Sequence, residues 1–177
     1  MKKSQKGFTL IELLVVIAII GLLSTLAVVA LNSARQRSRD AKRVADIRQI
    51  QTALELGFSE GSIYPTAGPT TNLVLGSADA TQLCINDAAT AVPIFANAAG
   101  NVAGTAPAAG GANGTSCAGT TFMGLVPSNP SPGGADYLYD STDGGTYNID
   151  FTLEGATGQL PAAENCATPD GITGGAC

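Results

Sequence analysis

An uninterrupted apolar run near the N-terminus limits the possible folds of this 177-residue chain more than any other feature. Residues 13–31, LLVVIAIIGLLSTLAVVAL, contain no charged side chain. At about 1.5 Å per residue, a helix of this length crosses a hydrocarbon layer of about 30 Å. The run exceeds the apolar part of a cleaved signal peptide, about 7 to 15 residues, and no clear A-x-A site follows it. We therefore predict a retained membrane-spanning helix over residues 8–31, which includes this run.

The residues before this run follow a specific pattern. A short basic leader, residues 1–7, ends in Gly7; Phe8 follows, and a lone carboxylate, Glu12, stands four positions later. This pattern resembles the leader and cleavage site of type IV pilins and type II secretion pseudopilins, and the resemblance covers about residues 1–58. It implies that a prepilin peptidase cleaves between Gly7 and Phe8 on the cytoplasmic side and methylates the new amine of Phe8.

Glu12 is costly at this place, because an acid at the centre of a membrane helix costs about 2.5 to 3.5 kcal/mol. The resemblance implies that the freed amine of Phe8 pairs with Glu12 of a neighbouring copy. Leaving either charge unpaired in an apolar surrounding is expensive, so the pair would penalise a wrong axial register between subunits. The alternative is that Glu12 simply extends to the lipid headgroups.

The next segment, residues 32–58, contains no proline, and we expect it to continue the helix as an amphipathic stem that ends at Gly57. On a helical wheel one face is apolar and the opposite face is charged. The apolar face carries Val44, Ile47, Ile50, Leu54 and Phe58, and the charged face carries Arg35, Arg39, Lys42 and Asp46. The family often has proline where this chain has Val29, so we expect less local melting of the helix.

Charge is divided unevenly along the chain. All nine basic residues lie at or before Arg48, and only acids follow. Direct nucleic-acid binding by the acidic part is therefore not expected. The basic cluster from Arg35 to Arg43 is either a solvated helix face or a surface that complements the acidic heads of adjacent subunits. A bare positive-inside count would keep the C-terminus in the cytoplasm, but the cysteines favour an oxidising compartment.

Residues 59–177 are expected to form the head. Residues 59–121 are rich in Ala, Gly, Thr and Asn and are predicted to be a variable loop region with a short helix near residues 78–83. In residues 122–177, TYNIDFTLE alternates as a half-buried strand does, residues 136–139 predict its antiparallel partner, and residues 122–126 a third strand. The fold class is α+β: a long N-terminal helix packed on a small antiparallel sheet of about three strands.

Four cysteines, with no C-x-x-C pair, favour disulfide bonds. Of three possible connectivities we favour the two adjacent loops, Cys84 with Cys117 and Cys166 with Cys177. An Asn-Gly-Thr triplet at residues 113–115 fits the glycosylation pattern, which is frequent by chance.

Asp136, Asp140 and Asp143 crowd one turn and are candidate calcium ligands, as major pseudopilins bind calcium in a head loop. The EF-hand spacing is missing, and the alternative is a solvated acidic turn. No other metal or cofactor is expected.

The resemblance implies a structural subunit of a type IV pilus or a type II secretion pseudopilus, between which the sequence does not decide. Such a subunit is a single-pass protein of the bacterial cytoplasmic membrane with its head outside. An assembly ATPase and a polytopic platform protein then draw it into a helical homopolymer. The alternative is a membrane-anchored binding module or adhesin that does not polymerise. An enzyme is disfavoured, because the chain has no histidine or metal-ligand set to activate a nucleophile.

Overall fold

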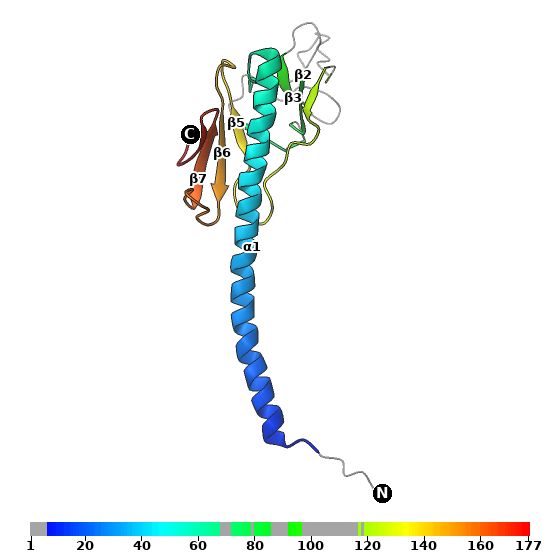
Figure 1. Cartoon of the computed structure of the whole chain (residues 1–177), viewed down its shortest axis with the longest axis vertical. Coiled ribbons are helices and arrows are strands. Elements are labelled where there is room, and N and C mark those ends of the chain that lie inside the picture. Colours follow the sequence, from blue (N-terminus) through cyan, green and yellow to red (C-terminus); the bar gives the residue numbers. More distant parts are fainter. Residues whose placement is uncertain (1–6, 68–71, 79, 86–91, 97–116, 118) are drawn as a thin grey trace. The chain divides into compact units, whose positions relative to one another are not determined.

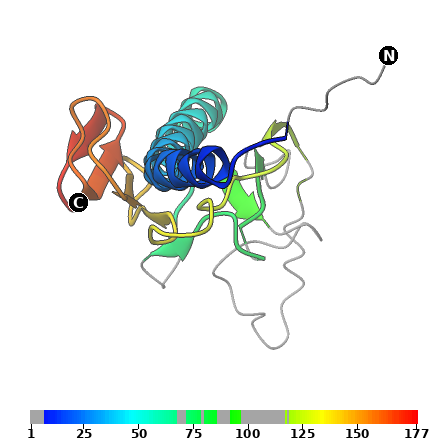
Figure 2. The same cartoon turned by 90° about the horizontal axis from the view of Figure 1, so that it is seen from below.

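The computed structural model describes residues 7–67, 72–78, 80–85, 92–96, 117 and 119–177. The chain divides into two compact units, residues 1–38, here the first unit, and residues 39–177, here the head unit. One helix, α1 (Leu10–Gly61), contributes residues to both. Figure 1 shows α1 as a single helix, and Figure 2 shows the strands of the head unit flanking its later part.

Besides the later part of α1, the described head unit contains two antiparallel sheets and the loops between their strands. The larger has the order β1-β5-β6-β7-β8, with β1 (Leu73–Val74), β5 (Leu138–Asp140), β6 (Asn148–Leu153), β7 (Ala163–Thr168) and β8 (Gly171–Gly174). The smaller has the order β3-β2-β4, with β2 (Gln82–Ile85), β3 (Pro93–Ala96) and β4 (Thr121–Met123). The α+β class and the long helix are therefore confirmed, but the strands are more numerous than the sequence indicated.

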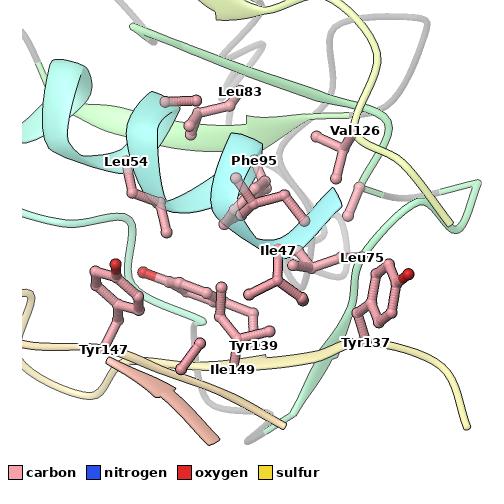
Figure 3. Packing of buried hydrophobic residues seen from close by; sticks show 14 of the residues in the cluster. Ile47, Leu54, Leu75, Leu83, Phe95, Val126, Tyr137, Tyr139, Tyr147 and Ile149 are labelled. Atoms are coloured by element: carbon pink, nitrogen blue, oxygen red, sulfur yellow. The ribbon is translucent and has the colours of Figure 1, made fainter. Parts of the chain in front are cut away.

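The core of the head unit joins α1 to both sheets. Ile47, Ile50 and Leu54 are fully buried, and Val44 and Phe58 are partly buried against the same cluster, so the predicted apolar helix face is confirmed. Figure 3 shows side chains from α1, from β5 and β6 and from the small sheet meeting in one cluster. Alternation along β6 sends Ile149, Phe151 and Leu153 into this core.

The helix does not end at Gly57, as the sequence suggested, but continues to Gly61. Gly57 is buried, and a Cβ there would lie 3.3 Å from the Cβ of Pro93 and 3.4 Å from Cε2 of Phe122. The glycine thus permits close approach of the small sheet rather than a helix stop. Ser62 ends the helix instead: its φ is 57°, and its N–H donates to the carbonyl of Phe58 at 2.7 Å.

One further prediction about the head was wrong, and the structure adds pairings that the sequence did not indicate. The helix expected near residues 78–83 is replaced by a turn and by β2, whose Leu83, Cys84 and Ile85 are buried. The strand expected at residues 122–126 is present as β4, and it pairs with β2 in the smaller sheet. The C-terminal tail, for which no strand was predicted, forms the hairpin β7–β8, and β7 pairs with β6.

Candidate functional site

The predicted cleavage site lies outside the helix. Gly7, Phe8 and Thr9 precede α1, Phe8 is 90% exposed, and a Cβ at Gly7 would meet no atom within 4 Å. Exposed segments of this kind are the ones that proteases reach most readily. The Gly7–Phe8 peptide bond is thus sterically open.

Thr9 and Glu12 form a reciprocal cap at the start of α1. The N–H and the hydroxyl of Thr9 donate to Oε2 of Glu12 at 2.7 and 2.6 Å, and the N–H of Glu12 donates to the Thr9 hydroxyl at 3.3 Å. This is the capping box, which satisfies N–H groups that a helix start otherwise leaves unpaired. The T-x-x-E spacing is a sequence signal for this cap, whereas the two roles expected for Glu12 were pairing with another copy and extension to the lipid headgroups. Glu12 therefore already has donors within its own chain.

The apolar part of α1 has no protein cover among the described residues. Its large apolar side chains from Leu10 to Leu31 are 48 to 82% exposed, and α1 is long and apolar enough to cross a membrane. The hydroxyls of Ser24 and Thr25 donate to the carbonyls of Ile20 and Leu22 at 2.7 and 2.8 Å, so neither is left unpaired. The helix is unbroken at Val29.

A polar network in the head unit, which the sequence analysis missed, fixes the helix to two loops. Arg43 is fully buried and uses all its N–H groups. Its Nε donates to Asn129 at 2.7 Å, and its Nη1 donates to Asp40 and Glu154 at 2.6 and 2.8 Å. Its Nη2 donates to the carbonyls of Pro130 and Gly133. Because every donor is used, the network offsets the cost of burying the guanidinium.

The carboxylates of this network are also fully engaged. Asp40 is 1% exposed and accepts the N–H groups of Glu154 and Gly155, both at 2.9 Å. Glu154 additionally accepts from Nε of Arg39 at 2.7 Å. The hydrogen bonds from Arg39, followed by the one from Arg43, lower the pKa of Glu154 to about 2. The same hydrogen bond to the Glu154 carboxylate raises the pKa of the Arg39 guanidinium.

These contacts correct the interpretation of the basic cluster. Arg39 was assigned to a charged helix face opposite the core, but it is bound to Glu154, and Arg43 is inside the head unit. Asp46, assigned to the same face, is 6% exposed, with Lys42 Nζ 3.5 Å away and the hydroxyl of Tyr137 at 3.3 Å. Part of the cluster therefore stabilises the head rather than facing water.

The remaining predicted site residues are the four cysteines, the acidic turn and the glycosylation triplet. The structure joins Cys84 to Cys117 and Cys166 to Cys177, which are the two adjacent loops. Asp143 accepts the N–H of Gly145 at 2.9 Å and so shapes the turn. Among the described residues no three His, Cys, Asp or Glu side chains form a group able to hold a metal, so Asp136, Asp140 and Asp143 do not converge. The triplet at residues 113–115 lies outside the described residues.

Comparison with known proteins agrees with the N-terminal geometry. Residues 2–28 match the family model described as the prokaryotic N-terminal methylation motif. Type II secretion system core protein G of Klebsiella michiganensis is 40% identical over 65 residues, 37% of this chain and 46% of that protein. A fimbrial protein of Pseudomonas aeruginosa is 40% identical over 68 residues, 38% of this chain and 44% of that protein.

The type IV major fimbrial protein FimA of Dichelobacter nodosus is 44% identical over 78 residues, 42% of this chain and 47% of that protein. Over part of its length this chain is similar to type II secretion core proteins and type IV fimbrial proteins. It spans less than half the length of these three relatives. The search of solved structures gives no significant match. The resemblance predicted from the residues around Gly7 and Glu12 is thus confirmed.

Proposed function

We propose that this protein is a structural subunit of a helical filament, either a type IV pilus or a type II secretion pseudopilus. One arrangement carries the proposal: an open Gly7–Phe8 peptide directly precedes a capped helix start and a long apolar helix with exposed side chains. An apolar surface of this extent requires a bilayer or other copies of the same helix. A subunit that moves from membrane to filament uses both in turn.

Processing prepares the subunit for assembly. A prepilin peptidase cuts between Gly7 and Phe8 on the cytoplasmic side and methylates the amine of Phe8, which leaves a cation just before Thr9. A carboxylate has about four acceptor positions, so Glu12 accepts from Thr9 and still has room for the amine of a neighbouring copy. The cap holds the carboxylate in the first turn, where it sets the axial register between subunits.

The remaining partners follow from this role. The subunit waits in the cytoplasmic membrane with its head outside, and an assembly ATPase acting through a platform protein draws it into the polymer. The paired cysteines suit an oxidising compartment on that side. In this role the protein acts by polymerising and not by catalysis.

Substitution of Glu12 by alanine tests the proposal. We expect the Glu12→Ala protein to be cleaved and inserted normally but to yield at least tenfold fewer filaments, because an unpaired buried amine costs well over 1.4 kcal/mol. Glu164→Ala is the control, since Glu164 is an exposed acid on β7. Normal filament numbers from Glu12→Ala would refute the assembly role and favour an anchored binding module.

A deletion of the gene separates the two filament types. Loss of surface fibres identifies a pilus subunit. Accumulation of secreted enzymes in the periplasm, with surface fibres intact, identifies a pseudopilus subunit.

A further inference from the structure

Two arginines just after the apolar run have no partner within the described part of the chain. Arg35 and Arg37 are exposed, and among the described residues neither makes an ion pair or a side-chain hydrogen bond. The next arginines, Arg39 and Arg43, differ sharply, because both are held by Glu154 in the head unit. Within the described residues, the basic cluster therefore consists of an engaged part, Arg39 and Arg43, and a free part, Arg35 and Arg37.

The free part lies at a defined depth. Arg35 and Arg37 come four and six residues after Leu31, the end of the apolar run, and α1 continues through them without a break. This places their Cα atoms about 6 and 9 Å beyond the run, at about 1.5 Å per residue. The headgroup layer on each side of a bilayer is about 5 to 8 Å thick. Side chains on a helix lean toward its N-terminus, so both guanidinium groups are directed back toward this layer.

The angular placement favours lipid over a second copy as the partner. Residues two apart are separated by about 200° around a helix, so Arg35 and Arg37 lie on opposite sides of α1. Before assembly, a single neighbouring helix in the membrane would cover one side only. Lipid surrounds the helix and contacts both sides at once. The planar guanidinium group also matches phosphate oxygens in a two-pronged hydrogen bond.

We propose that Arg35 and Arg37 bind the phosphates of anionic phospholipids in the leaflet where the apolar helix leaves the membrane. This inference rests on the membrane placement proposed above. Leaving the bilayer for the filament breaks both contacts, so anionic lipid holds the subunit in the membrane. Lipid composition thereby regulates how readily the subunit is extracted.

The test is lipid selectivity of the full-length protein in phosphatidylcholine vesicles. Electron paramagnetic resonance measures the relative association of trace spin-labelled phosphatidylglycerol and spin-labelled phosphatidylcholine with the protein. We expect Arg35→Gln and Arg37→Gln each to lower the preference for phosphatidylglycerol by up to about fivefold, which corresponds to about 1 kcal/mol per arginine. High salt lowers the preference of the unaltered protein in the same direction.

Arg48→Gln is the matched control, because Arg48 is an equally exposed arginine of α1 that belongs to the head unit. It should leave the preference unchanged. The lipid contact is refuted if the double variant of Arg35 and Arg37 keeps the original preference, or if Arg48→Gln lowers it as much. Removal of the unaltered protein from the vesicles by an alkaline wash refutes instead the membrane placement itself, so the two failures are distinguishable.

Discussion

Replacing Glu154 by glutamine removes the acid that joins Arg39 to Arg43. Its two carboxylate oxygens accept three hydrogen bonds from these arginines, and Arg43 is fully buried. A pKa of about 2, against 4.5 without these contacts, corresponds to about 3 kcal/mol of stability at neutral pH. The side chain is 19% exposed and solvent screens part of this interaction, so we expect a loss of about 2 kcal/mol.

The effect of Glu154→Gln on the free energy of unfolding should depend on pH. Because folding lowers the pKa of Glu154, its contribution is complete above about pH 4.5 and is lost as the pH falls toward about 2. The free energy of unfolding of the unaltered protein should therefore decrease through this range more steeply than that of Glu154→Gln. The difference between the two proteins should shrink from about 2 kcal/mol at pH 7 to near zero at pH 2.

Urea unfolding of the full chain in detergent, followed by near-ultraviolet circular dichroism of the buried tyrosines, measures both quantities. Glu164→Gln provides the control, because Glu164 is an exposed acid of β7, and its loss should change stability by less than about 0.5 kcal/mol. If Glu154→Gln is as stable as this control, or if the difference does not depend on pH, the account of the network is wrong.

Further predictions concern other parts of the head. Substituting Cys166 and Cys177 by serine should lower the free energy of unfolding by about 3 kcal/mol, the loop-closure value for a separation of 11 residues. Added reductant should shift the urea midpoint of the unaltered protein by at least as much, because it also opens the Cys84–Cys117 disulfide. Gly134→Ala should lower the free energy of unfolding by about 1 to 3 kcal/mol, because φ is 78° and a Cβ would lie 2.9 Å from Nε of Arg43. A urea midpoint equal to that of the unaltered protein would contradict this. Absorbance titration should detect no phenolate until well above pH 10, since burial raises the pKa of all four tyrosines, that of Tyr64 to about 12. Stability should then fall as the pH rises above 10, where the unfolded chain ionises first, and early ionisation would show that the tyrosines are not buried.

Local patterns in the sequence predicted the elements whose character depends on near neighbours. The apolar run, the buried face of α1 through Ile47 and Leu54, and the alternating strand β6 all follow from periodicity alone. The T-x-x-E spacing at Thr9 is a sequence signal of a helix cap. The Pro-Asp-Gly sequence at residues 169–171, where β7 turns into β8, is a signal of a turn. The resemblance implied a partner for Glu12 in a second copy, whereas the donors of the cap lie within the same chain.

Long-range pairing was beyond the reach of these patterns. Arg43 and Glu154 are 111 residues apart, and nothing near either residue indicates that they meet. The run around Leu83 is short, and a few apolar residues fit a buried strand as well as a helix. Gly57 suggested a helix end because glycine commonly ends helices. Its actual role, close approach to Pro93, depends on the small sheet, which no local pattern indicated.

The central claim is that the chain is processed between Gly7 and Phe8 and then polymerises through its N-terminal helix. Mass spectrometry of the intact protein from membranes and from sheared filaments tests it most directly. We predict that both preparations contain a chain that begins at Phe8 with a methylated amine. A retained Met1 in the filaments, or a mature chain that begins after Leu31, would contradict the account.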